Sequence, residues 1–271
     1  MIPIQSADRV VTQNSNVGRS MNYRLDARNL RHIVTMLRDS VYSNKILAVI
    51  REYSTNAIDA HAAAEEAGSV GHRTKPIEVH LPTKFAPELR IRDFGLGLSE
   101  KEIETIYISL GESTKRQSNK YVGSLGFGCK SGFAYGDRFV VTSWNAGRQT
   151  VYNNVLDDYV PEGARCDIMA ETQCTPTDTG IEICVPIKQG EIEECKQVAL
   201  NFFKYWTTFP IITGASEEEV KEACAYKKTK SIFEGPNWII YPRTNSYANS
   251  SKGIALMGDV PYTLDWDLVK R

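Results

Sequence analysis

The sequence predicts an α+β fold, a two-layer sandwich in which a mostly antiparallel sheet carries helices on one face. Helical patterns come first along the chain and a run of short alternating segments follows, an order that argues against repeated βαβ units. The alternating segments are joined by short connections, which favour antiparallel neighbours. Hydrophobic residues make up 42% of the 271 residues, enough for a substantial core.

A long helix is predicted from residue 43 to residue 67, because the segment holds alanines and straight-chain residues and no proline. Ser43 is a suitable N-cap and Gly68 a suitable C-cap. An apolar stripe recurs along the segment at helical spacing and should face the core. The stripe consists of Ile46, Val49, Ile50, Tyr53, Ala57 and Ala60.

A polar face of the same helix carries Glu52, Asn56 and Asp59. Positions 52 and 56 are one turn apart, and position 59 lies beside them. The neutral amide oxygen of Asn56 suits Mg²⁺, which keeps several of its ligands as water or phosphate. The Glu52 carboxylate, one turn away, could deprotonate an attacking water. The alternative is that these polar side chains simply face solvent.

The segments on either side of this helix have recognisable patterns. Residues 1–23 are polar and predict an arm or a peripheral strand, whereas residues 25–37 follow the helical period. Residues 77–81 and 88–92 alternate between apolar and polar and predict a hairpin. The second strand leads into Asp93-Phe94-Gly95-Leu96-Gly97, where a carboxylate precedes two glycines that let the backbone approach a ligand closely.

A glycine-rich segment precedes a short predicted helix. Its glycines, Gly123, Gly126 and Gly128, have N–H groups that could face phosphates. The spacing does not match a Walker A loop, because Cys129 separates Gly128 from Lys130.

The remaining helices and strands follow from local patterns. Ser99 and Glu102 resemble a capping box that opens a helix ending near Leu110. We assign residues 1–210 to a first domain and residues 211–271 to the start of a second domain or a C-terminal extension. The other predicted strands are 138–144, 150–156, 164–171, 180–187, 237–241 and 253–257, and the other predicted helices are 191–205 and 217–225.

Composition narrows the classes of function. The net charge of −1 and the pI near 6.5 argue against a nucleic-acid-binding surface. The six cysteines form no CxxC pair, which argues against a zinc site and favours free thiols in a reducing compartment. No run approaches the ~20 apolar residues that span a bilayer, and the N-terminus has no signal-peptide pattern. We therefore expect a soluble, cytoplasmic protein.

Several motifs, taken in order, resemble the GHKL ATPase superfamily. This superfamily includes gyrase B subunits, MutL, MORC proteins, histidine kinases and the large heat-shock chaperone with an ATP-binding N-domain. The resemblance covers residues 25–187 and implies a Bergerat-type fold. The whole arrangement, with the arm and residues 254–262, most resembles the phage rIIA lysis-inhibition proteins. The matching motifs are Tyr42 to Lys45, Arg51-Glu52, Asn56 to Ala60, Asp93-x-Gly95-x-Gly97 and Gly123 to Phe133.

The resemblance implies a role for each matching residue. Glu52 would be the general base and Asn56 the magnesium ligand, while Asp59 would support the nucleotide pocket. Asp93 would accept a hydrogen bond from the adenine amino group, above a turn formed by Gly95 and Gly97. The other implied nucleotide contacts are Lys115, Gly123, Gly126, Gly128, Lys130 and Thr179.

One departure from the superfamily concerns Thr179. Members usually close the pocket with a Gly-Thr pair, but here Thr179 precedes Gly180. Either Thr179 substitutes for the usual threonine, or the contact with adenine is altered.

The resemblance implies a magnesium-dependent ATPase that acts as a slow conformational switch and dimerises when ATP binds. For a phage rIIA-like protein, it also implies a location in the host cytoplasm, a host or phage protein partner, and an effect on host defence or lysis timing. One alternative is a non-hydrolysing, nucleotide-gated binding or dimerisation module, in which Glu52 only pairs with Arg51 or a lysine. Another is a chaperone-like or MORC-like ATPase. A histidine kinase is disfavoured, because His32 has no acidic residue immediately after it.

Overall fold

The computed structural model describes residues 44–68, 74–105, 128–157, 159–160, 163–226, 233–235, 238–240, 252–257 and 259–265. The predicted arm at 1–23 and the predicted helix at 25–37 lie outside these ranges. So do Lys115, Gly123 and Gly126 of the predicted nucleotide site.

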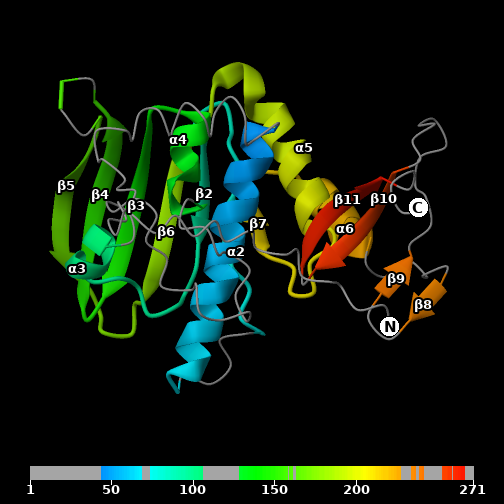
Figure 1. Cartoon of the computed structure of the whole chain (residues 1–271), viewed down its shortest axis with the longest axis horizontal. Coiled ribbons are helices and arrows are strands. Elements are labelled where there is room, and N and C mark those ends of the chain that lie inside the picture. Colours follow the sequence, from blue (N-terminus) through cyan, green and yellow to red (C-terminus); the bar gives the residue numbers. More distant parts are fainter. Residues whose placement is uncertain are drawn as a thin grey trace, which may run out of the picture.

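A seven-stranded sheet with the order β5-β4-β3-β6-β2-β1-β7 forms the centre of the fold (Figure 1). Neighbouring strands are antiparallel except β1 and β7, which are parallel. The strands are β1 (Glu78–His80), β2 (Glu88–Arg92), β3 (Arg138–Asn145), β4 (Arg148–Leu156), β5 (Ala164–Gln173), β6 (Gly180–Pro186) and β7 (Ile211–Thr213).

Helices cover one face of this sheet, so the predicted α+β two-layer fold is confirmed (Figure 1). The long helix α2 (Lys45–Glu66) contacts α4 (Ser131–Tyr135), α5 (Ile192–Phe203) and strands β2 and β6. Within the described ranges, every helix is too short or too polar to cross a lipid bilayer. The other elements are α3 (Glu100–Ile103), η5 (Gly128–Lys130), η6 (Gln189–Glu191), α6 (Glu217–Ala225) and the hairpins β8 (Phe233–Gly235) with β9 (Trp238–Ile240) and β10 (Lys252–Met257) with β11 (Val260–Asp265).

The N-terminus of α2 differs from the prediction by one residue. The N-cap is Asn44, whose Oδ1 accepts a hydrogen bond from the Leu47 N–H at 2.7 Å, and not Ser43. Asparagine and serine cap helices about equally well, so the local sequence allowed either start. The predicted apolar stripe is confirmed: its members are buried except Ala60, which is half-buried.

The order of strands also corrects the prediction that short connections join neighbours. β5 and β6 are linked by only residues 174–179, yet β6 lies between β3 and β2. The central position buries three inward side chains of β6, Ile181, Ile183 and Val185, which an edge position would cover less well. The parallel strand β7 was not predicted, because three residues are too few to show an alternating pattern.

The sheet has one long edge strand, β5, with an irregularity at its centre. Val151 pairs with Ala170 and the next residue, Tyr152, pairs with Ile168, so Met169 has no partner on β4. This extra residue is a β-bulge, which bends the strand locally. The Met169 side chain is 63% exposed.

Residues beyond 210 contribute to the main sheet, because β7 pairs with β1. The predicted helix at 217–225 is confirmed as α6, which contacts α5. The predicted strands near 237–241 and 253–257 correspond to β9 and β10. The division between residues 1–210 and 211–271 stays a prediction.

Aromatic packing joins α2, α4 and β3. Phe139 on β3 is fully buried, with the ring of Phe133 at a centroid distance of 4.9 Å, edge to face, and that of Tyr53 at 6.2 Å. Such pairs add to the stability gained from burial alone. The core beside the long helix therefore depends on residues that are distant in sequence.

We expect Phe139→Ala to lower the free energy of unfolding by about 3–5 kcal/mol, because it leaves a cavity among close-packed rings. Phe85, which is fully exposed in the turn between β1 and β2, provides the matched control. Phe85→Ala should change stability by no more than about 0.5 kcal/mol. Urea denaturation followed by circular dichroism measures both, and equal losses would contradict the assigned core.

Candidate functional site

One helix carries three of the predicted site residues. Glu52, Asn56 and Asp59 lie on α2, with Glu52 and Asn56 half-buried and Asp59 only 3% exposed. The helical repeat places the first two one turn apart. Their carboxylate and amide groups are therefore held at a fixed spacing by the backbone.

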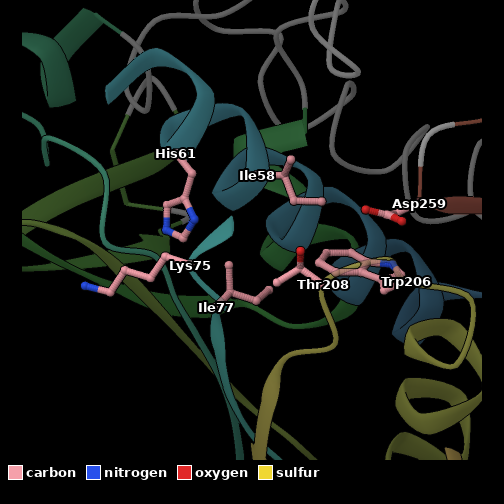
Figure 2. Close-up of a pocket in the computed structure, with 7 residues that line it drawn as sticks. All are labelled: Ile58, His61, Lys75, Ile77, Trp206, Thr208 and Asp259. Carbon is pink, nitrogen blue, oxygen red and sulfur yellow. The ribbon is translucent and has the colours of Figure 1, made fainter. Parts of the chain in front are cut away.

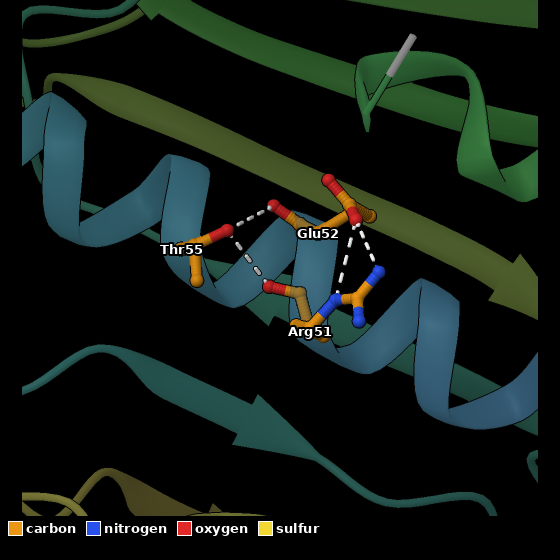
Figure 3. Close-up of polar contacts among 3 residues, drawn as sticks. All are labelled: Arg51, Glu52 and Thr55. Atoms are coloured by element: carbon orange, nitrogen blue, oxygen red, sulfur yellow. Dashed lines mark hydrogen bonds and ion pairs between the residues drawn. The ribbon is translucent and has the colours of Figure 1, made fainter. Parts of the chain in front are cut away.

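An ion pair orients the Glu52 carboxylate (Figure 3). Arg51 Nη2 and Nε lie 2.8 and 3.3 Å from Glu52 Oε1. Adjacent residues on a helix normally point apart, so the long arginine side chain has to bend back to make this contact. Thr55 Oγ1 donates to the carbonyl oxygens of Arg51 and Glu52 at 2.9 and 3.1 Å. The sequence left open whether Glu52 pairs with Arg51, and the structure shows this ion pair.

The end of the glycine-rich segment lies directly against Glu52. A Cβ atom at Gly128 would be 2.6 Å from Glu52 Oε2, closer than real Cβ contacts come. A side chain at position 128 would therefore push the carboxylate end of Glu52 out of its observed place. The predicted base and the predicted phosphate-binding segment meet at this contact.

Tyr53 fixes that segment to α2. Its hydroxyl donates to the Cys129 carbonyl at 3.1 Å and accepts from the Gly132 N–H at 2.8 Å. Burial raises the pKa of Tyr53 well above its ordinary value, so the hydroxyl keeps the proton that it donates. One side chain from the long helix thus links η5 to the first turn of α4.

Lys130, a predicted phosphate contact, is buried in this structure. The residue is 3% exposed, and its Nζ lies 3.4 Å from Cys129 Sγ. Burial raises the pKa of the Cys129 thiol, while the Lys130 ammonium acts in the opposite direction. A contact between Lys130 and phosphate stays a prediction.

Asp93 follows β2 and is held by backbone amides. The residue is 6% exposed, and its Oδ1 accepts from the N–H groups of Gly95 at 2.8 Å and Ile181 at 3.2 Å. The Asp93 N–H donates in turn to the Ile181 carbonyl at 2.8 Å. The carboxylate is therefore fixed between its own loop and the start of β6.

The two glycines of this loop lie against other segments. A Cβ at Gly95 would be 2.9 Å from Ala60 Cβ on α2, and a Cβ at Gly97 would be 2.0 Å from the Trp144 carbonyl oxygen. The loop thus packs between α2 and β3. Both glycines thus allow close packing within the protein, and an approach of this backbone to a ligand stays a prediction.

Thr179 lies immediately before β6, beside Asp93. Its carbonyl accepts from Arg92 Nη2 at 3.3 Å. Gly180 has φ +113°, and a Cβ there would be 2.2 Å from the Asp93 carbonyl oxygen. Glycine is therefore required at position 180. A contact between Thr179 and a base stays a prediction.

His61 is a site residue that the sequence did not single out. It is 2% exposed, and its Nε2 accepts a hydrogen bond from the Phe94 N–H at 2.8 Å. A signal was present in the pattern, because position 61 lies one turn from the buried residues Ala57 and Ala64. A buried imidazole needs a hydrogen-bond partner, so that position indicated a specific contact.

A small cavity of about 40 Å³ lies beside His61, and its lining includes none of the predicted nucleotide residues (Figure 2). Groups of His, Cys, Asp or Glu suited to hold a metal are absent among the described residues. The cavity is lined by Ile58, His61, Lys75, Ile77, Trp206, Thr208 and Asp259.

The comparison with known families agrees with this geometry. Residues 44–177 match the family model described as histidine kinase-, DNA gyrase B-, and HSP90-like ATPase. The match supports the GHKL superfamily. The matched GHKL segment runs from the N-cap of α2 to the connection before β6, and includes Glu52, Asn56, Asp93 and Gly128. The family match suggests ATP binding.

No curated protein matches the chain. The finer resemblance to phage rIIA proteins stays a prediction.

We expect Tyr53→Phe to lower the free energy of unfolding by about 1–3 kcal/mol, because it leaves the Cys129 carbonyl and the Gly132 N–H without this partner. Amide exchange at Gly132 should accelerate in the same variant. Tyr159→Phe is the control, since Tyr159 is 97% exposed. Unchanged exchange at Gly132 in Tyr53→Phe would contradict the bridging role.

Proposed function

We propose that the chain binds ATP with Mg²⁺ and hydrolyses it, as a slow conformational switch. The observation that carries the proposal is the contact between Gly128 and the Glu52 carboxylate, which leaves no room for a Cβ atom. This contact joins a glycine-rich segment to a carboxylate that is one helical turn from Asn56. The family match, which suggests ATP binding, supports the same function.

The side chains on α2 fit a magnesium ion that is completed by phosphate and water. Asn56 would supply its amide oxygen, and among the described residues no cluster of carboxylates or histidines offers a protein-only cage. Mg²⁺ commonly takes only one or two protein ligands at nucleotide sites. When bound, the ion would neutralise negative charge on the phosphate oxygens.

Glu52 would take a proton from the attacking water. Arg51 holds Oε1, and Oε2 faces Gly128, where a water beside the terminal phosphate would have to lie. Positioning and charge neutralisation account for most of the acceleration of phosphoryl transfer. The backbone N–H groups near Gly123, Gly126 and Gly128, with Lys115 or Lys130, would contact the phosphates.

Asp93 would select the base at the other end of the nucleotide. Its carboxylate, fixed by the Gly95 and Ile181 amides, would accept from the adenine amino group. Asp59 and Thr179 would complete this part of the pocket. The proposal extends to homodimerisation on ATP binding and to an rIIA-like role in the host cytoplasm, both carried by resemblance alone.

A second candidate function is a nucleotide-gated binding module that does not hydrolyse ATP. The Arg51–Glu52 ion pair favours it, because the guanidinium occupies one of the two carboxylate oxygens that a general base would present to water. In this case, nucleotide binding alone would change the conformation or the oligomeric state.

We expect Glu52→Gln to bind ATP with nearly the wild-type dissociation constant and to release phosphate about 10²–10⁴-fold more slowly, the usual contribution of a general base. Chelation of Mg²⁺ should abolish phosphate release by the wild type. Fluorescent-nucleotide titration and a phosphate-release assay measure the two properties side by side. Wild-type binding without turnover would select the second candidate function, and no binding would refute both.

A second prediction concerns the contact at Gly128. Gly128→Ala should displace the Glu52 carboxylate and slow phosphate release by about 10²-fold, since small displacements of a catalytic group are costly. Gly190 in η6 is the matched control, because a Cβ atom added there would have no heavy atom within 4 Å. Gly190→Ala should retain the wild-type rate, and equal rates in both variants would refute the assignment of Gly128.

A further inference from the structure

His61 connects the loop after β2 to the helix that carries Glu52 and Asn56. The Phe94 N–H can only donate, so His61 Nε2 must be the acceptor in their 2.8 Å hydrogen bond. The imidazole in this contact is therefore neutral, with its proton on Nδ1. At 2% exposure, the contact is shielded from competing water.

A second contact fixes the same loop to α2 through the residue after Phe94 and the residue before His61. Gly95 follows Phe94, and a Cβ there would overlap Ala60, the residue before His61. The loop is thus held to α2 at two adjacent points, by a hydrogen bond and by close packing. The Gly95 N–H, at the second of these points, donates to Asp93 Oδ1.

The Phe94 side chain is restrained as well. Lys75 Nζ lies 3.9 Å from the centre of its ring and the Arg92 guanidinium 5.1 Å from it, both within the range of cation–π attraction. The His61 ring lies 6.3 Å away at a tilted angle. Residues from three segments therefore hold Phe94, and His61 adds a hydrogen bond from α2 to its backbone.

We propose that His61 is a positioning residue that sets selectivity for a purine with a 6-amino group. By fixing the Phe94 amide to α2, it fixes the Asp93 carboxylate relative to Glu52 and Asn56 on the same helix. The group that contacts the base, Asp93, and the groups at the phosphates, Glu52 and Asn56, are then held at a constant separation. The inference rests on the proposed function, in which Asp93 accepts from the adenine amino group.

The test compares the dissociation constants of ATP and inosine triphosphate, which has a carbonyl oxygen in place of the 6-amino group. The wild type should prefer ATP, and His61→Leu should lower this preference at least about tenfold through loss of a correctly placed acceptor. His61→Gln, whose side-chain oxygen can accept from the Phe94 N–H, should restore most of it. Thr208→Val, which changes another residue in the lining of the same cavity, should behave as the wild type.

Amide hydrogen exchange at Phe94 provides a second readout that needs no nucleotide. It should accelerate in His61→Leu and stay slow in His61→Gln and Thr208→Val. If His61→Leu does not fold, His61→Met replaces it in the comparison, because the methionine sulfur is a weaker hydrogen-bond acceptor than the imidazole nitrogen.

The outcomes separate the two proposals. An unchanged ATP preference in a folded His61→Leu variant overturns the role of His61 and leaves the proposed function intact. Wild-type protein that binds ATP and inosine triphosphate equally overturns the selectivity role. Wild-type protein that binds neither overturns the proposed function and the selectivity role together.

Discussion

The burial of the apolar stripe of α2 against the sheet is the interaction on which the remaining arrangement depends. Ile50 and Val49 are almost fully buried, so the rotation of the helix about its axis is fixed. That rotation sets where Glu52 and Asn56 point. It also aims Tyr53 at the η5–α4 junction and His61 at the loop after β2. Two segments far apart in sequence are thus placed by a single helix.

Local structure could largely be predicted from the sequence, because its signals lie within a few residues. The capping box of Ser99 and Glu102 is present as expected, and the alternation at residues 88–92 corresponds to β2. The position of β6 and the parallel pairing of β7 could not be predicted. Both are decided by which strands bury one another, and the residues paired between β1 and β7 and between β2 and β6 lie 90 or more positions apart in the chain.

The same distinction applies to the candidate site. Glu52 and Asn56 were found because helical spacing alone groups them, and Asp93 because a carboxylate before two glycines is a local pattern. The contact between Gly128 and Glu52 joins residues 76 positions apart and required the fold. The buried position of His61 could be expected from its spacing to Ala57 and Ala64, but its bond to Phe94 joins residues 33 positions apart and also required the fold. The Arg51–Glu52 pair is local, but adjacent helical residues rarely meet, so the sequence left it as an alternative.

The bulge at Met169 has a consequence for how copies of this protein behave when they are crowded together. β5 is a ten-residue edge whose outer backbone groups could template a strand from another molecule. A straight edge of that length, with Ile168 and Met169 exposed, would favour stacking of sheets into fibrils. The unpaired residue bends the edge at its midpoint and divides it into two shorter stretches, each too short to recruit a neighbour well. One extra residue thus makes this ten-residue strand a poorer template for aggregation than a straight edge would be.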